Sequence, residues 1–245
     1  MGQSLDDIVS DYFQRPQVVQ HYLRATAGIG LWRSEETLIR RYFEPTETLL
    51  ELGCGTGRIA LAMHELGYRH LLGVDLFRPM VEQAREAARA LEYGVSFQVA
   101  DACRLPFEDG LFDGAIFGFN GLMHLAGRSR RATALSEIRR IVAPGGHFLF
   151  TTHDRQQPQF RDFWAIERER WAAGEQDPRL EEFGDRIVPT DGGEVFIHIP
   201  ERTEMEALLA EAGWELVLCA PRHEVAEEPP EVRAFSDECI FWVVR

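Results

Sequence analysis

Lysine is absent from this chain of 245 residues, so all 26 of its basic residues are arginines. Without lysine the protein cannot form a Schiff base with a substrate or use the lysine of a phosphate-binding loop. The basic residues are outnumbered by 40 acidic residues, which gives a formal net charge of −14. Because this charge repels a phosphate backbone unless a local basic face compensates, the composition argues against nucleic acid as a partner.

Cysteine is scarce, and the four cysteines form no C-x-x-C pair: Cys54, Cys103, Cys219 and Cys239. Neither a zinc site nor a redox dithiol is therefore indicated, the histidine spacings support no metal, and free buried thiols are the simpler interpretation. No apolar run reaches the roughly 18 residues of a membrane span, and the acidic N-terminal stretch lacks the basic and apolar regions of a signal peptide. We therefore expect a cytoplasmic protein that does not enter a membrane.

The chain does contain a regular alternation of apolar runs and helical patterns. We expect strands at 48–52, 70–75, 95–100, 112–118 and 146–152, and helices at 57–66, 78–92 and 129–141. Strands that alternate with helices form a parallel sheet with right-handed crossovers. A further helix, capped by Thr203 with Glu206 in a capping box and Gly213 after its end, precedes two last strands at 214–219 and 238–244.

Two segments depart from this alternation. Residues 4–43 are predicted to form two or three short helices, capped by Ser4 and Ser34, that precede the core as a flap. The stretch 154–200 joins an aromatic, charged segment to RIVPTDGGEVFIHIP, which indicates a β-hairpin inserted over the site. The acidic stretch HEVAEEPPEVRAFSD is interpreted as a solvated connection. We expect one domain with four parts: a flap (1–45), a cofactor-binding core (46–153), an inserted lid (154–200) and a C-terminal completion of the sheet (201–245).

The stretch LLELGCGTGRIA places a glycine-rich turn directly after the first strand, where such turns usually hold a nucleotide. A dinucleotide fingerprint would need a third glycine where Arg58 stands, and a phosphate loop would need a lysine followed by a hydroxyl residue. Glu51, beside the turn, would repel a pyrophosphate but favour a cationic ligand. The turn therefore predicts a nucleoside ligand without phosphate.

Carboxylates occur at the ends of three successive strands: Glu51, Asp75 and Asp101. At the end of the second strand, Asp75 could accept both hydroxyls of a ribose, and the backbone of Ala102 and Cys103 could meet the edge of an adenine. Each acidic residue taken singly is as easily a helix cap or a solvated turn residue. The ordered set is far more specific and predicts one nucleoside site along this edge of the sheet.

Over residues 47–152 the motifs ELGCGTG, GVD, ADACRLPFEDGLFD and IVAPGG follow one another in order. This series closely resembles the class I S-adenosylmethionine-dependent methyltransferases, and most of all their small-molecule and quinone-type members. The resemblance implies an α/β fold: a Rossmann-like, seven-stranded, mostly parallel sheet with helices on both faces and an antiparallel last strand. It also implies S-adenosylmethionine as cofactor and S-adenosylhomocysteine as product.

The same resemblance implies a role for individual residues. The glycine turn would approach the methionine part of the cofactor with Glu51 beside it, and Asp75 would hold the ribose hydroxyls. Phe119 and Asn120, just after the fourth strand, would contact the cofactor and face the substrate. The complete set of implied cofactor residues is Glu51, Gly53, Cys54, Gly55, Gly57, Asp75, Leu76, Met80, Asp101, Ala102, Cys103, Phe119, Asn120, Tyr12 and Tyr22.

The implied reaction is an in-line displacement at a sulfonium methyl group, whose leaving group departs neutral. Alignment in a dry pocket supplies much of the rate, and a general base is needed only for a protonated hydroxyl or amine. His124, His153 and His198 are the candidates for this base. The first two follow the carboxyl ends of strands, although packing or turn roles explain them equally well, and His198 lies in the insertion hairpin. Trp32, Trp164 and His198 are the candidates for acceptor contacts, with core packing the default explanation of the two tryptophans.

Three hypotheses follow. The leading one is an S-adenosylmethionine-dependent methyltransferase that acts on a small-molecule acceptor. The second is a methyltransferase that acts on a tRNA nucleoside or a protein, which predicts a basic or peptide-wide groove. The third is a cofactor-binding module that transfers no methyl group and serves as the partner subunit of another protein.

Overall fold

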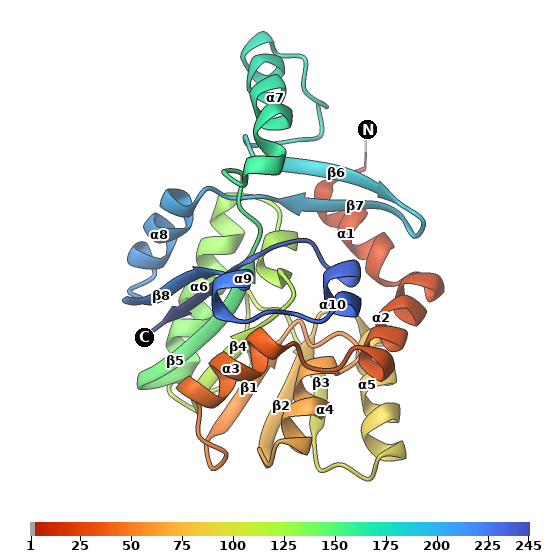
Figure 1. Cartoon of the computed structure of the whole chain (residues 1–245), viewed down its shortest axis with the longest axis vertical. Helices are drawn as coiled ribbons and strands as arrows, with labels where there is room; N and C mark the ends of the chain where they lie inside the picture. Colours follow the sequence, from red (N-terminus) through yellow and green to blue (C-terminus); the bar gives the residue numbers. More distant parts are fainter. Residues whose placement is uncertain (1–2) are drawn as a thin grey trace.

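A computed structural model describes residues 3–245. Its seven-stranded sheet has the order β3-β2-β1-β4-β5-β9-β8 (Figure 1). Strands β1 to β5 are parallel, and β9 runs antiparallel to both of its neighbours. The predicted Rossmann-like sheet with a reversed last strand is thereby confirmed. The strands are β1 (Thr48–Leu52), β2 (His70–Asp75), β3 (Ser96–Val99), β4 (Phe112–Phe117), β5 (Val142–Thr152), β8 (Leu216–Pro221) and β9 (Ile240–Val244).

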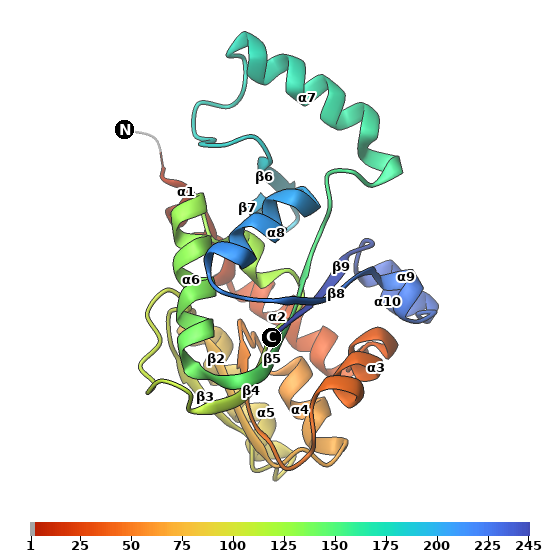
Figure 2. The same cartoon turned by 90° about the vertical axis from the view of Figure 1, so that its left-hand side faces the viewer.

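Helices cover both faces of the sheet, because side chains along a strand point alternately to the two sides. In β5, Phe148 and Phe150 pack into one core while Leu149 packs into the other. Figure 2 shows the two layers on opposite sides of the strands. One layer holds α3 (Arg33–Tyr42), α4 (Arg58–Glu65) and α5 (Arg78–Ala90), and the other holds α6 (Arg128–Ile141) and α8 (Arg202–Glu211).

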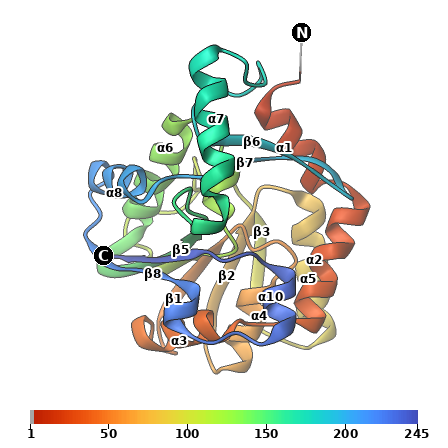
Figure 3. The same cartoon turned by 45° about the horizontal axis from the view of Figure 1, so that its top comes forward.

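The N-terminal helices and the stretch between β5 and α8 lie beyond the carboxyl ends of the parallel strands. A small core joins them, in which Ile8 and Val9 pack with Phe196. The predicted hairpin is present, and Figure 3 shows it beside the N-terminal helices. Helix α7 extends away from the sheet (Figure 2). These elements are α1 (Leu5–Phe13), α2 (Pro16–Gly28), η2 (Pro158–Phe160), α7 (Arg161–Ala173), β6 (Asp185–Thr190) and β7 (Gly193–His198). A short helix, η1 (Gly121–His124), lies between β4 and α6.

Helix capping agrees with the sequence at some positions and not at others. Ser4 caps α1 as predicted, since its Oγ accepts a hydrogen bond from the amide of Asp7 at 3.1 Å. The prediction that Ser34 caps the next helix is wrong, because α3 already begins at Arg33. The backbone amides at the N-terminus of α3 donate instead to two glutamates. Glu35 accepts from Trp32 N at 2.8 Å, and Glu228 accepts from Ser34 N at 2.9 Å. The second glutamate is remote in sequence, so no local pattern could reveal it.

Helix α8 is also capped differently from the prediction. It begins at Arg202 with Glu201 at its N-cap, and Glu204 occupies the capping-box position assigned to Glu206. Thr203 therefore lies inside the first turn. Gly213 follows the C-cap with φ of +78°, the left-handed conformation that was predicted for it.

The acidic connection between β8 and β9 is not simply solvated. It contains two short helices, α9 (Arg222–Val225) and α10 (Pro230–Phe235), and buries both Glu228 and Val232. The Ser34 hydroxyl donates a 2.5 Å hydrogen bond to Glu228, which attaches the connection to α3. Among the residues from 3 to 245, no helix combines the length and the apolar character needed to cross a membrane.

Candidate active site

A cavity lies where the parallel strands end, as open α/β sheets favour. The centre of a water molecule can move through about 140 Å³ of it, about ten times the space that one water needs. Its wall also includes residues of α1, α2, η1 and α10. The predicted site residues that line it are Tyr22, Glu51, Gly53, Cys54, Gly55, Asp75, Leu76, Met80, Asp101, Ala102, Phe119 and His124.

The turn after β1 requires glycine for two separate reasons. Gly53 has φ of +56°, and a Cβ atom there would lie 2.6 Å from the ring of Phe117. Gly57 has φ of +91° and occupies the N-cap of α4, where a Cβ atom would lie 3.0 Å from Phe97. Left-handed backbone and close packing together leave little room for any side chain. The turn therefore exposes its backbone to the cavity, as its proposed contact with a cofactor requires.

Glu51 lies beneath this turn with only 6% of its surface exposed. Its Oε2 accepts a hydrogen bond of 2.9 Å from the amide of Ala60, in the first turn of α4. Burial raises the pKa of Glu51 to about 8, and that bond only partly offsets the effect. Near neutral pH the carboxyl group is therefore largely protonated until a cation approaches it.

Asp75, at the end of β2, fixes the glycine turn as well as facing the cavity. One carboxylate oxygen accepts from Gly55 N at 2.9 Å, and the other accepts from Phe77 N at 2.8 Å. Burial raises the pKa of Asp75 to about 6 despite these bonds. Each oxygen retains a second lone pair, so two hydroxyl groups can still donate to it.

Asp101 and Ala102 line the same cavity from the segment that follows β3. Asp101 Oδ1 accepts from Cys103 N at 2.9 Å, which holds this turn in place. The Cys103 thiol points elsewhere, toward the carbonyl oxygen of Arg130 at 3.4 Å, and is not part of the lining. Cys103, whose backbone was predicted to meet an adenine, therefore does not line the cavity, and its amide bonds to Asp101 instead.

Phe119 and Asn120 follow β4 in an unusual conformation, with φ of +50° and +60°. Consecutive left-handed residues other than glycine are uncommon, and such backbones occur preferentially at functional sites. Phe119 lines the cavity, whereas Asn120 lies behind it. Two hydrogen bonds hold Asn120. Its backbone N–H donates to Thr151 Oγ1 at 2.8 Å, and its side-chain Nδ2 lies 3.3 Å from His153 Nε2.

Two of the three candidate bases, His124 and His153, occupy different environments. His124 lines the cavity, and its Nδ1 lies 2.8 Å from the carbonyl oxygen of Phe196 in the hairpin. Burial lowers the pKa of His124 to about 4, so its ring is neutral at physiological pH. His153 does not line the cavity, and both of its ring nitrogens already have partners, Glu238 O at 3.0 Å and the Asn120 amide.

The remaining predicted residues lie outside the cavity lining. Tyr12 contacts Thr190 of the hairpin through its hydroxyl at 3.4 Å. Trp32 is completely buried, and two guanidinium groups lie against its ring, Arg58 at 5.0 Å and Arg222 at 5.2 Å. Trp164 packs against Phe183 within the inserted segment. The spacing of the aromatic residues in the sequence could not distinguish core packing from contact with an acceptor.

Several lining residues were not predicted from the sequence. Arg58 forms a bidentate ion pair with Glu35, with both N–O distances 2.6 Å. The hydroxyls of Thr26 and Thr56 meet across the cavity wall at 2.7 Å. Arg58 carried a signal, since it replaces the third glycine of a dinucleotide fingerprint. Phe13, Phe77 and Phe235 also line the cavity, and only Phe77 carried a signal, its proximity to Asp75.

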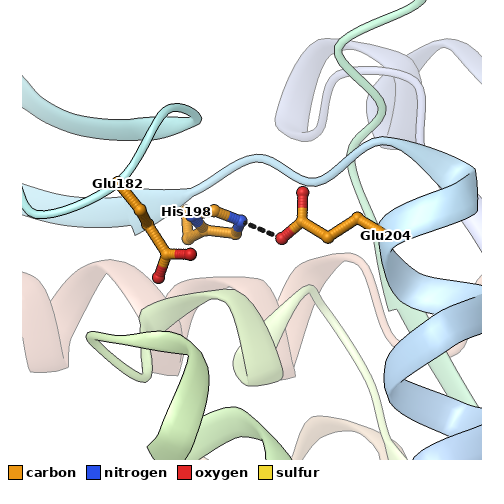
Figure 4. Close-up of side chains that lie close together, drawn as sticks. All are labelled: Glu182, His198 and Glu204. Carbon is orange, nitrogen blue, oxygen red and sulfur yellow. Dashed lines mark hydrogen bonds and ion pairs between the residues drawn. The ribbon is translucent and has the colours of Figure 1, made fainter.

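His198 belongs to a buried charge cluster instead (Figure 4). Its Nδ1 bonds to Asp185 at 2.8 Å and its Nε2 to Glu204 at 2.6 Å. Burial alone would lower the pKa of His198, but these two hydrogen bonds outweigh burial and raise it. Glu182 also approaches, so three potential metal ligands lie within 4.8 Å. Arg131 already lies 2.7 Å from Glu182 and would compete with a metal ion there.

The sequence of this chain is similar to sequences of known methyltransferases. Residues 49–146 match the family model described as "Methyltransferase domain". The chain is 32% identical over 150 residues to a protein of Symbiobacterium thermophilum named "Demethylmenaquinone methyltransferase", covering 59% of this chain and 55% of that protein. It is also 32% identical over 118 residues to mouse "Probable tRNA methyltransferase 9B", covering 48% of this chain but 24% of that protein.

Solved structures resemble more of the chain. A SAM-dependent methyltransferase from Methanosarcina mazei aligns with a TM-score of 0.68 at 20% identity, over 88% of this chain and 97% of that one. The curated relatives, by contrast, are matched over about half of their length or less. The shared region in sequence is therefore the strand-and-helix core with its glycine turn, while the likeness in fold extends to the surrounding elements.

Proposed function

We propose that this chain, whose residues 49–146 match a methyltransferase domain and whose fold is that of the class I S-adenosylmethionine-dependent methyltransferases, transfers the methyl group of S-adenosylmethionine to a small organic acceptor. The observation that supports this most directly is the convergence of Glu51, Asp75 and Asp101 on one cavity beside the glycine turn. When bound, the cofactor supplies a methyl group on a positively charged sulfur. The residues around it bind, orient and exclude water.

The proposed cofactor roles follow from the charges and hydrogen bonds of these side chains. Glu51 would favour the cationic methionine end, and approach of that cation would ionise its carboxyl group. Asp75 would accept from the ribose hydroxyls while keeping its bonds to the turn. Asp101 and the backbone after it would meet the adenine. The N-terminal helices, which contribute Phe13 and Tyr22 to the lining, and the insertion at 154–200, which contacts His124 through the carbonyl oxygen of Phe196, would form the lid.

A small acceptor is favoured over tRNA by the ion pairs of α6, the most basic helix near the site, because four of its five arginines pair with a carboxylate. Arg128 pairs with Glu211 at 2.5 Å, and Arg140 pairs with Asp109 at 2.8 Å. Arg130 pairs with Asp6 and Arg131 with Glu182. Charges neutralised in this way offer little attraction to a phosphate backbone. A tRNA substrate, suggested by the name of the mouse relative, would have to bind elsewhere.

Isothermal titration calorimetry tests the proposal. S-adenosylmethionine and S-adenosylhomocysteine should bind, and NAD should not; tight binding of NAD would refute it. Replacing Asp75 with Ala should weaken S-adenosylhomocysteine binding by about 1.5 to 3 kcal/mol, the range for hydrogen bonds to a charged group. Asp109→Ala, which changes an exposed carboxylate remote from the cavity, is the control and should bind normally.

Because Asp75 also holds the glycine turn, its replacement could weaken binding without any direct contact to the ribose. A second experiment therefore changes the ligand and not the protein. The native protein should bind the 2′-deoxy analogue of S-adenosylhomocysteine more weakly than the parent compound. The Asp75→Ala variant should bind the analogue and the parent with equal affinity. An undiminished preference for the parent in the variant would assign the ribose to another residue. Tight cofactor binding with no turnover, and co-purification as a stable heteromer, would instead favour the non-catalytic partner subunit.

A further inference from the structure

Five aromatic side chains form a connected set along the cavity: three come from α1, α2 and α10, and two follow the ends of β2 and β4. We call Phe13, Tyr22, Phe77, Phe119 and Phe235 the aromatic wall; all five line the cavity. Phe13 stacks on Phe77 with centroids 5.4 Å apart, and Phe119 stacks on Phe235 at 5.1 Å. Tyr22 connects the two pairs, at 6.0 Å from Phe13 and 5.9 Å from Phe119. Surfaces of this kind favour flat, aromatic ligands.

The aromatic wall is poor in uncompensated charge. The carboxylates that line the cavity follow β1, β2 and β3, where the cofactor is proposed to bind. Among residues 3–245, Arg58 is the one arginine in the lining, and both of its terminal nitrogens are already paired with Glu35. An anionic acceptor would therefore lose its hydration without gaining a free cation. A cationic acceptor would be attracted by the aromatic faces but repelled by the positively charged sulfur of the methyl donor. The acceptor portion that lies against the wall should be uncharged.

His124 stands beside the wall, with its ring 5.0 Å from that of Phe13 and nearly perpendicular to it. A carbonyl oxygen can only accept a hydrogen bond, so the contact with Phe196 requires the proton of neutral His124 to be on Nδ1. The other nitrogen, Nε2, is then an unprotonated acceptor, and among residues 3–245 the side-chain hydrogen bond of His124 is made by Nδ1 alone. The bond to Phe196 orients the ring and favours its protonated form, against the larger effect of burial, which lowers the pKa of His124 to about 4.

From the aromatic wall, its lack of free charge and the orientation of His124, we propose that the acceptor is an uncharged aromatic hydroxyl compound and that His124 is the catalytic base. The inference rests on the proposed function, since it presupposes the methyl donor. The hydroxyl proton moves to His124 Nε2 as an oxygen lone pair forms the bond to the methyl carbon. The carbon–sulfur bond breaks, its electron pair remains on sulfur as a neutral thioether, and His124 later releases the proton to water.

Binding to the protein saturated with S-adenosylhomocysteine tests the acceptor class. The ligands are 2-naphthol, its anionic analogue 2-naphthoate and its saturated analogue decahydro-2-naphthol, compared by calorimetry. The naphthol should bind at least about tenfold more tightly than either analogue, because only it combines a flat ring with no charge. Equal or tighter binding of the carboxylate or of the saturated alcohol would overturn the proposal, as would a failure of 2-naphthol to bind.

Methyl transfer from labelled S-adenosylmethionine tests the role of His124. With 2-naphthol, His124→Gln should lose about 100-fold or more in turnover, within the range for removal of a general base. With 2-naphthalenethiol, which is largely ionised near pH 8 and needs no base, the variant should stay within about fivefold of the native enzyme. Turnover of 2-naphthol by the variant should recover as rising pH ionises the acceptor itself. His70→Gln, at the exposed start of β2, is the matched control and should leave both rates unchanged.

The outcomes separate this inference from the proposed function. If S-adenosylhomocysteine fails to bind the native protein, the proposed function falls and the inference with it. If it binds but no naphthol is methylated, only the acceptor class is overturned. Equal losses with the naphthol and the thiol would show that His124 has a structural role and is not the base.

Discussion

The buried carboxyl group of Glu51 gives a quantitative prediction about stability. Its pKa is raised from 4.5 to about 8 by burial, so between these values the folded protein holds a proton that the unfolded chain releases. Stability therefore falls as pH rises through this window, by about 1.4 kcal/mol per pH unit for this one group. Replacement by Gln removes the titration and keeps an oxygen that can accept from the amide of Ala60.

The expected magnitude follows from the same window. Relative to the native protein, Glu51→Gln should be more stable by about 2 to 4 kcal/mol at neutral pH, whereas at about pH 5 the difference should be roughly 1 kcal/mol or less. The difference in free energy of unfolding between the two proteins is measured by urea denaturation at several pH values, followed by tryptophan fluorescence in the absence of cofactor. A difference that does not change with pH, or one that favours the native protein more as pH rises, would refute the reasoning.

Saturating S-adenosylmethionine extends the same experiment to function. If a cation near Glu51 stabilises its ionised form, the native protein should gain more stability from the cofactor at about pH 8 than at about pH 6. Glu51→Gln should show a gain that does not depend on pH in this range. An identical pH dependence in both proteins would place the positive charge of the cofactor away from Glu51.

Three further predictions concern the supports of the site. Gly53→Ala should destabilise the protein by about 2 kcal/mol or more, and Gly55→Ala by about 1 kcal/mol, because both have positive φ but only the former would place its Cβ atom against Phe117; thermal unfolding of the pair measures this. Glu228→Gln should cost about 0.5 to 2 kcal/mol, since a charged cap of α3 is lost, and should increase proteolysis between β8 and β9. Because the pKa of His198 is raised, its contribution to stability is complete below the unfolded value of 6.5 and lost as pH rises through the folded value. The deficit of His198→Gln should therefore be largest, at least about 2 kcal/mol, in mildly acidic buffer and shrink toward alkaline pH in urea titrations.

The strand-end half of the site was predictable from the sequence for a geometric reason. Parallel strands all end at one edge, so carboxylates that follow three of them must approach one another in space. Glu51, Asp75 and Asp101 accordingly line one cavity. The second role of Asp75, holding the glycine turn through Gly55, could not be predicted, because it depends on the exact approach of two backbones.

The other half of the site was not predictable, because its residues come from segments whose position is decided by long-range contacts. Phe235 reaches the cavity because Glu228 attaches its segment to the amides of α3, almost 200 residues away in sequence. Phe13 reaches it because α1 packs its apolar side on the hairpin. Neither contact leaves a periodic pattern in the sequence, and the acidic composition around Phe235 favoured a solvated loop instead.

Strand β7 links the buried charge cluster to the proposed base. Its residue Phe196 provides the carbonyl oxygen that orients His124, and two positions further along, His198 is held between Asp185 and Glu204. A strand is stiff over so short a distance, so the ion pairs that fix His198 also fix the carbonyl oxygen of Phe196. Burying these charged groups costs more free energy than burying an apolar contact of similar size. An ion pair with hydrogen bonds, however, is stable in only one geometry, whereas an apolar contact tolerates several. Its charges are therefore best explained as a means of placing that carbonyl, and through it the proton of His124, in a single position.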